Sequence, residues 1–199
     1  HSSFFIELYN IISLFSLIYF RNLLYNIVKY VSKSGVSMNI NTTYTKIITG
    51  EDLMETAQHG STLYPFQFYY EDLSVFDFNC IEWHWHTELE FIYIESGTVT
   101  LWIGEDQFHL TEGNGIFINT KVLHRLYSPS KALIPNFVFM PSFIAPCDSL
   151  IYQKYILPII SSSLPFLVFH KKVCWQAKVL SIMRQIISAQ DSVSTKELL

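Results

Sequence analysis

Hydrophobic and polar residues alternate along short segments between about Leu63 and Met140, and turn-forming residues separate these segments. Successive side chains on a strand point to opposite faces, so each alternating segment predicts a β-strand with one buried face. Many short strands with turn signals between them indicate an all-β sandwich or barrel.

The clearest hairpin predicted from this pattern pairs Glu88–Glu95 with Thr98–Ile103 through a turn at Ser96 and Gly97. A two-residue turn would place Glu95 opposite Thr98, and this pairing fixes which side chains share a face. We expect the face with the parity of His84 and His86 to line the barrel. It carries Glu90, Ile92, Ile94, Val99, Leu101 and Ile103.

The opposite face of the same hairpin is rich in aromatic residues and needs cover from a C-terminal helix or a second subunit. It carries Phe91, Tyr93, Thr98, Thr100 and Trp102.

After Pro141 the pattern changes to helical spacing. Asp148–Leu157 predicts a short helix that Pro158 ends, and Leu164–Phe169 predicts an edge strand. Cys174–Ala189 is the best helix pattern in the chain. Its apolar stripe is typical of a core or a dimer interface, and we predict a dimer interface formed by Trp175, Val179, Ile182, Met183 and Ile186.

Residues 1–37 form a hydrophobic extension whose charges are few. Three interpretations stay open: a membrane anchor, a helix that packs on the domain or a partner, or translated upstream sequence foreign to the natural protein. The uncharged run Leu8–Phe20 is shorter than the roughly 20 residues that span a bilayer. We therefore separate 1–37 from a main domain at 38–170 and a helical dimerisation or linker segment at 171–199.

The chain of 199 residues carries a formal net charge of −4, and its longest basic run is Lys171-Lys172. Nucleic-acid affinity rests largely on clustered Lys and Arg, so this piece is not expected to bind nucleic acid by itself. Cys80, Cys147 and Cys174 are odd in number and lack CxxC spacing. They predict buried thiols in a reducing compartment, which indicates the cytoplasm.

The strongest chemical signal is a set of histidines with one carboxylate. His84 and His86 lie one residue apart on a predicted strand, Glu90 keeps their parity, and a returning strand could bring His124 opposite. Such a cluster suits a divalent transition metal or would hydrogen-bond a polar ligand. Three other histidines lack a partner at ligand spacing and are predicted at the surface: His59, His109 and His170.

Two further features of the pattern concern ligand contacts. Glu88 shares the inward parity of Glu90, so it is either a second acidic contact or, where the strand curves, a solvent-facing residue. Parity places Trp83, Trp85 and Trp102 on the outer face, which favours packing over sugar stacking.

These residues resemble the two cupin motifs. His84, His86, Glu90 and Gly97 match every interval of the first motif, and Gly113 and His124 match the second. Asn119 and Lys121 stand where the second motif has Pro and Gly. The resemblance implies a mostly β fold, a cupin (double-stranded β-helix or jelly-roll barrel) followed by C-terminal α-helices.

The departure at Asn119 narrows the resemblance. Ile118-Asn119 followed by His124, the segment Tyr155 to Pro158 and the long helix resemble the sensor domain of AraC/XylS-family transcriptional regulators, over about Leu63 to Ser192. In that family a cupin sensor binds a small effector, often a sugar or related metabolite, a helix supports dimerisation, and helix-turn-helix units follow. The chain would then end before the DNA-binding half.

The resemblance implies a cytoplasmic, homodimeric effector-binding domain without catalytic residues, which meets DNA only through the missing helix-turn-helix half. Its expected ligand contacts are His84, His86, Glu88, Glu90, Ile92, Leu101 and His124. The alternative is a metal-dependent cupin enzyme, a dioxygenase or isomerase, with His84, His86, Glu90 and His124 as metal ligands. A membrane-tethered sensor is a third possibility and depends on residues 1–37.

Overall fold

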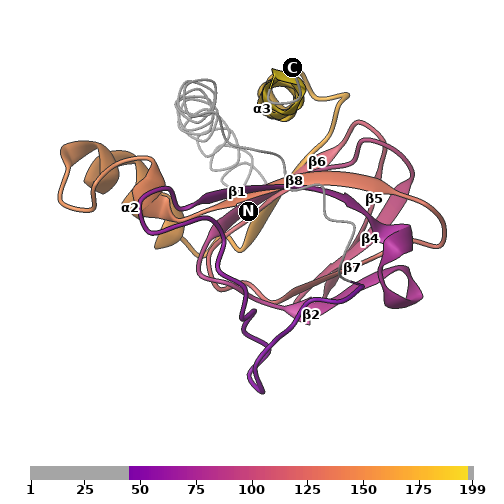
Figure 1. Ribbon diagram of the computed structural model, residues 1–199. Coiled ribbons are helices and arrows are strands. Elements are labelled where there is room, and N and C mark those ends of the chain that lie inside the picture. The colour runs from indigo at the N-terminus through magenta and orange to yellow at the C-terminus, as the bar shows by residue number, and fades with distance from the viewer. Residues whose placement is uncertain (1–44, 197–199) are drawn as a thin grey trace, which may run out of the picture.

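The computed structural model describes residues 45–196, with side chains placed through residue 189, so the predicted extension at 1–37 lies outside the described residues. Two antiparallel sheets face each other and enclose a barrel (Figure 1). The five-stranded sheet has the order β1-β8-β3-β6-β9 and the four-stranded sheet the order β2-β7-β4-β5. The predicted all-β barrel is confirmed.

The strands are short. They are β1 (Phe66–Asp72), β2 (Cys80–His84), β3 (Leu89–Tyr93), β4 (Thr98–Ile103), β5 (Asp106–Thr111), β6 (Gly115–Ile118), β7 (His124–Tyr127), β8 (Leu133–Phe139) and β9 (Phe166–Phe169). The helical elements are 3₁₀ turns at Leu73–Val75, Asp77–Asn79 and Pro141–Phe143, a π-helix at Tyr152–Ile156, α2 (Leu157–Ile160) and α3 (Cys174–Lys196).

The predicted hairpin between residues 88 and 103 is wrong. β3 pairs with β6 and β8, whereas β4 belongs to the other sheet and pairs with β5 and β7. The connecting residues pair with the start of β8 instead, because the amide of Glu95 donates to the carbonyl of Leu133. At Gly97 the backbone has a φ of +86°, and a Cβ there would meet the carbonyl oxygen of Lys131 at 2.7 Å. The chain therefore crosses between sheets at this point.

The predicted faces survive this change because strand parity does not depend on the partner strand. Val99, Leu101 and Ile92 join an aliphatic core between the two sheets. Phe91 and Tyr93 point the other way, into a second core beneath α3.

Helix α3 lies across the outer face of the five-stranded sheet (Figure 1). Gly115 on β6 permits this close approach, because a Cβ there would meet side-chain carbons of Leu180 at 3.0 Å and Met183 at 3.2 Å. The expected cover by a C-terminal helix is thus confirmed for Phe91 and Tyr93 of β3, whereas Trp102 lies on β4 in the other sheet and is not part of this core.

This packing changes the predicted dimer interface. Val179, Met183 and Ile186 are buried within the single chain, so they are core residues and the interface prediction is wrong for them. Trp175 and Ile182 are only partly buried. For these two residues the dimer interface stays a prediction.

The predicted helix at 148–157 does not stop at Pro158. It begins beyond Ser149, whose hydroxyl accepts a hydrogen bond from the amide of Tyr152, and it continues through a π-helical turn into α2. Pro158 lies in the first turn of α2, where a missing amide proton costs little. The edge strand expected at 164–169 is present as β9.

The three cysteines are free, but only Cys80 is buried, so the prediction of buried thiols is wrong for Cys147 and Cys174. Burial raises the pKa of the Cys80 thiol to about 11. Within residues 45–196, no helix has both the length and the apolar character needed to cross a bilayer.

Candidate ligand and metal site

The structure brings together the four residues of the predicted cluster. His84 at the end of β2 pairs in register with His124 at the start of β7, and their ring centroids lie 4.1 Å apart. His86 lies two residues after the end of β2, and Glu90 reaches across from β3 in the facing sheet. Each of the four is at most 6% exposed.

Two of the imidazoles are held in a defined tautomer. Nδ1 of His84 donates to the carbonyl oxygen of Glu82 at 2.8 Å, and Nδ1 of His124 donates to that of Val122 at 2.8 Å. A carbonyl oxygen only accepts, so Nδ1 carries the proton and Nε2 of each neutral ring keeps its lone pair. Metal-binding histidines are commonly oriented in this way by a backbone carbonyl.

Glu90 lies against two of the imidazoles. Its Oε2 is 3.3 Å from Nε2 of His86 and 3.2 Å from Nε2 of His124. The His124 nitrogen is buried and has no partner in hydrogen-bond geometry. An unprotonated nitrogen and a carboxylate oxygen at this distance repel each other unless a proton or a cation lies between them.

The donor set therefore fits a divalent transition metal. Ligand atoms of His84, His86 and His124 all lie within 4.8 Å of one another. Imidazole nitrogens bind such ions at about 2.0–2.1 Å, so donors on opposite sides of one ion are about 4.2 Å apart, and the three rings would close in by roughly half an ångström or more around it. Three imidazoles and the Glu90 carboxylate would hold the ion and leave positions open for another ligand.

The electrostatics of the cluster agree with this chemistry. Burial alone would raise the pKa of Glu90, but the contacts with His124 and His86 outweigh it and hold the pKa far below its usual range. Burial, reinforced by neighbouring His124, holds the pKa of His84 well below its usual value. Near neutral pH the pair therefore offers an ionised carboxylate and a neutral imidazole, the forms that bind metals.

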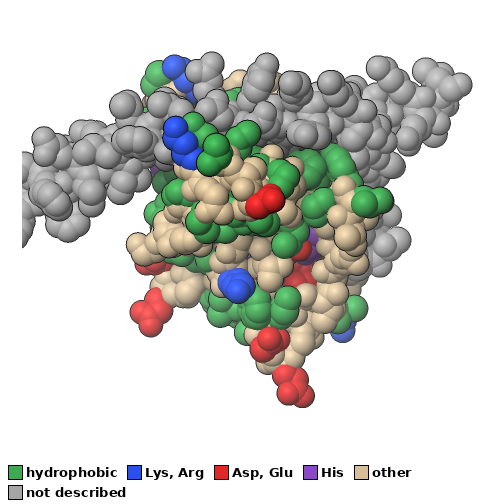
Figure 2. Space-filling model, turned by 90° about the vertical axis from the view of Figure 1, so that its left-hand side faces the viewer, with side chains coloured by type: hydrophobic (Ala, Val, Ile, Leu, Met, Phe, Trp, Pro, Cys, Tyr) green, Lys and Arg blue, Asp and Glu red, His purple; other side chains and the backbone are tan. Residues whose placement is uncertain are grey.

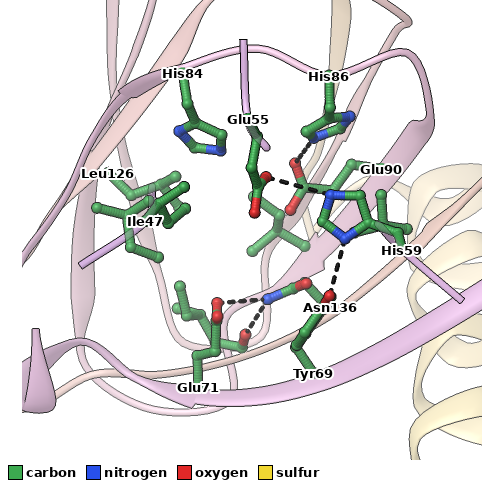
Figure 3. A pocket seen from close by; sticks show the side chains of 14 residues that line it. Ile47, Glu55, His59, Tyr69, Glu71, His84, His86, Glu90, Leu126 and Asn136 are labelled. Atoms are coloured by element: carbon green, nitrogen blue, oxygen red, sulfur yellow. Dashed lines mark hydrogen bonds and ion pairs between the residues drawn. The ribbon is translucent and has the colours of Figure 1, made fainter. Parts of the chain in front are cut away.

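A cavity of about 30 Å³ adjoins the cluster, and His84, His86, Glu90 and Ile92 line part of it (Figure 3). Three predicted ligand contacts do not line this cavity. Leu101 packs in the aliphatic core, and Glu88 instead places an oxygen 3.8 Å from Nδ1 of His86. The remaining predicted contact, His124, belongs to the cluster beside the cavity.

Several cavity residues were missed from the sequence. Five polar ones are Glu55, His59, Tyr69, Glu71 and Asn136. The alternation on β1 was a usable signal, because Phe66 and Phe68 pack in the core beneath α3 while Tyr69 and Glu71 have the opposite parity.

The surface prediction for His59 is wrong. This residue is 5% exposed, its Nδ1 lies 2.9 Å from the hydroxyl of Tyr69, and its Nε2 lies 3.2 Å from Oε2 of Glu55. His109 and His170 are exposed, as predicted.

The tryptophans stay outside the cavity. The indole nitrogen of Trp85 donates to the carbonyl oxygen of Asp52, and Arg125 stacks over Trp102 at 4.9 Å. Neither these two residues nor Trp83 line the cavity, as strand parity predicted.

Comparison with known families gives the fold its name. Residues 80–134, which include His84, His86, Glu90 and His124, match the model of the Cupin domain family. The fold is a cupin fold. The predicted fold class, a cupin barrel followed by C-terminal helices, is confirmed.

The chain is also similar to a curated protein of Bacillus subtilis (strain 168), the uncharacterized HTH-type transcriptional regulator YdeC. The two are 24% identical over 143 residues, which are 70% of this chain and 48% of the relative. The chain thus spans about half the length of the curated relative that it matches.

Among solved structures, the chain is similar to an RmlC-like cupin from Shewanella frigidimarina, with 17% identity, a TM-score of 0.35 and coverage of 38% of this chain and 67% of that one. A Cupin 2 conserved barrel domain protein from Salinispora arenicola gives 13% identity, a TM-score of 0.36 and coverage of 45% and 71%. A predicted oxalate decarboxylase from Thermotoga maritima is 16% identical, with a TM-score of 0.29 and coverage of 31% of this chain and 56% of that one.

Proposed function

We propose that this chain is the small-molecule-sensing cupin domain of an AraC-type transcriptional regulator. The observation that carries the proposal is the fully buried cluster of three imidazoles and a carboxylate beside a polar cavity. Burying such groups costs stability unless they are paired, so a cluster with an unpartnered nitrogen points to a bound ligand. The curated relative, an HTH-type regulator, supports a regulatory role for that ligand.

The arrangement of the barrel supplies a way to report binding. Glu90 and Ile92 of β3 face the cavity, while Phe91 and Tyr93 of the same strand pack beneath α3. A ligand that favours one position of β3 would shift the population of α3 positions. A cytoplasmic homodimer, with Trp175 and Ile182 at its interface, would then present its DNA-binding units differently. DNA contact itself would come only from helix-turn-helix units outside this sequence.

A divalent metal fits the same cluster and would act as a Lewis acid toward a ligand oxygen or nitrogen. His84, His86, Glu90 and His124 would hold it, and the effector would occupy the rest of the site. Backbone carbonyls of Glu82 and Val122 keep two of these imidazoles oriented.

One observation favours a second candidate, a metal-dependent cupin enzyme such as a dioxygenase or isomerase. His59 lines the cavity, and Glu55 and Tyr69 contact its two ring nitrogens. A histidine oriented by a carboxylate is a common general base, so the site contains a possible proton acceptor outside the metal-binding set.

The two candidates differ in what happens to a bound molecule. The purified chain, loaded with Zn²⁺, Mn²⁺ or Fe²⁺ in turn, would be screened against a metabolite library by thermal shift. Each hit would then be incubated and recovered by mass spectrometry. A sensor returns its ligand unchanged, and His84→Ala weakens binding. Catalytic conversion of a hit, or the absence of any hit with correctly folded protein, would overturn the proposal.

A further inference from the structure

The segment that precedes β1 contributes a wall of the cavity that the motif residues do not explain. Ile47, Glu55 and His59 all line it. This segment is fastened beside the histidine cluster, because the amide of Glu55 donates to the carbonyl oxygen of Trp85 and the amide of Trp85 donates to that of Leu53. In Figure 3 the carboxylate of Glu55 lies in the middle of the view, between His84 and His59.

Glu55 is partnered only in part by its histidine neighbour. Its Oε2 lies 3.2 Å from Nε2 of His59, yet that buried nitrogen has no partner in hydrogen-bond geometry. The other ring nitrogen of His59 is engaged by the hydroxyl of Tyr69 at 2.9 Å. A donor entering the cavity would therefore find the Glu55 carboxylate available to accept from it.

The charge of the cavity selects the sign of that donor. Three carboxylates, those of Glu55, Glu71 and Glu90, line it, and no Lys or Arg is among its described lining residues. An anion would be repelled from this site, whereas a cation would be attracted. On the face seen in Figure 2, acidic and histidine side chains are visible at the bottom of a narrow hollow.

The size of the cavity limits the size of the ligand group that can enter it. At about 30 Å³ it takes a small polar group and not a sugar ring. A second pocket of about 220 Å³ shares Ile47, Glu55 and Tyr69 with it. Its lining adds the apolar side chains of Ile48 and Ala57, together with Lys46 and Thr56. A ligand could place its charged group in the cavity and an apolar part in this pocket.

We propose that Glu55, His59 and Tyr69 form a second recognition site for the ammonium group of a small primary amine, whose apolar substituent fills the neighbouring pocket. This inference rests on the proposed sensor function, for which it names the class of effector. It adds recognition by the segment before β1 to recognition by the histidine cluster.

Three matched probes test the class: butylamine, 1-butanol and butyrate, titrated calorimetrically into EDTA-treated protein at pH 7 and low salt. Butylamine should bind at least about tenfold more tightly than 1-butanol, because a hydrogen bond to an ionised partner is roughly twice as strong as a neutral one. Butyrate should bind most weakly. Equal affinities for the amine and the alcohol would overturn the inference, whatever any variant does.

Variants then locate the site. Glu55→Gln should lower the affinity for butylamine about tenfold with little effect on 1-butanol, since it removes charge and keeps shape. Glu105→Gln, in an exposed turn, is the control and should change neither affinity. Unchanged amine binding by folded Glu55→Gln protein would also overturn the assignment.

The metabolite screen with recovery by mass spectrometry separates this inference from the sensor proposal. If a polyol or a carboxylate binds and is recovered unchanged, and His84→Ala abolishes that binding, the amine class is wrong and the sensor proposal stands. If a bound compound of any class is converted to product, the sensor proposal itself fails.

Discussion

If a divalent metal binds the histidine cluster as proposed, replacing His124 with alanine should remove most of the stabilisation that the metal gives this protein. His124 is the most deeply buried member of the cluster, and its Nε2 lies 3.2 Å from Glu90 without a hydrogen-bond partner. The variant loses one of four donors. Because second-shell changes alone weaken metal binding about 10–100-fold, we take about 100-fold as the lower estimate for a lost ligand.

That loss converts into a measurable change in melting temperature. Metal at about 100 times its Kd stabilises the folded protein by about 2.7 kcal/mol. For a domain of this size each kcal/mol moves the Tm by about 2–4 °C, so the wild type should gain about 5–11 °C. In the variant the same metal concentration only matches Kd, which gives about 0.4 kcal/mol and a rise of about 1–2 °C.

Scanning calorimetry of EDTA-treated protein, with and without added Zn²⁺ or Mn²⁺, measures both rises. Each protein is compared with itself, so a destabilising effect of the substitution on the metal-free state cancels. His109→Ala, an exposed histidine, is the control and should keep the full rise. A full metal-dependent rise in His124→Ala, or none in folded wild-type protein, would refute the assignment of these donors.

The remaining predictions concern the fold and its response to acid. Phe91→Ala should lower the free energy of unfolding, measured in urea, by about 3–5 kcal/mol, because Phe91 is fully buried. Phe78 is 89% exposed, so Phe78→Ala should change this free energy by less than about 0.5 kcal/mol. Similar losses for both variants would contradict the core assignment. Gly97→Ala should destabilise more than Gly104→Ala, since both positions have positive φ but only Gly97 faces a steric clash, and equal effects would argue against the crossing geometry. Because the pKa of His84 is depressed in the folded state, metal-free protein should lose stability as pH falls below about 6.5, and His84→Gln should flatten this dependence.

Much of the inner surface of the barrel follows from strand parity alone. His84, His86 and Glu90 share one parity, and the pleat of a strand puts such residues on one face whichever strand lies beside it. The cover over Phe91 could be anticipated for the same reason, since an aromatic face that large is not left in water.

Strand parity in the sequence does not predict which strands pair with each other. The run from β3 to β4 looks like a hairpin because Ser96 and Gly97 have turn chemistry, yet the deciding contact is with Leu133, far along the chain. Sheet topology depends on such non-local pairings, which a local pattern does not contain. Pro158 shows the same limit in a helix, because its neighbours continue through a π-helical turn that places the proline where no amide is needed.

The second half of the cavity was missed for a related reason. His59 and Glu55 lie before the first strand and have no strand parity to reveal their direction. The bridge from this segment to Trp85 and the contact of His59 with Tyr69 place them at the cavity. Tyr69 and Glu71 did carry a signal, in the alternation of β1 with its buried phenylalanines.

Strand β3 separates the cavity from the aromatic core beneath α3, and its successive residues face one or the other in turn. Glu90 and Ile92 face the cavity between the sheets, and Phe91 faces the aromatic core, where its ring is stacked at 5.2 Å on Phe137 and at 6.3 Å on Phe169. A close-packed aromatic layer transmits displacement because it has little free volume to absorb it. A substitution that loosens the packing of those rings should therefore change the affinity of the cavity for its ligand, although the substituted residue does not contact the ligand.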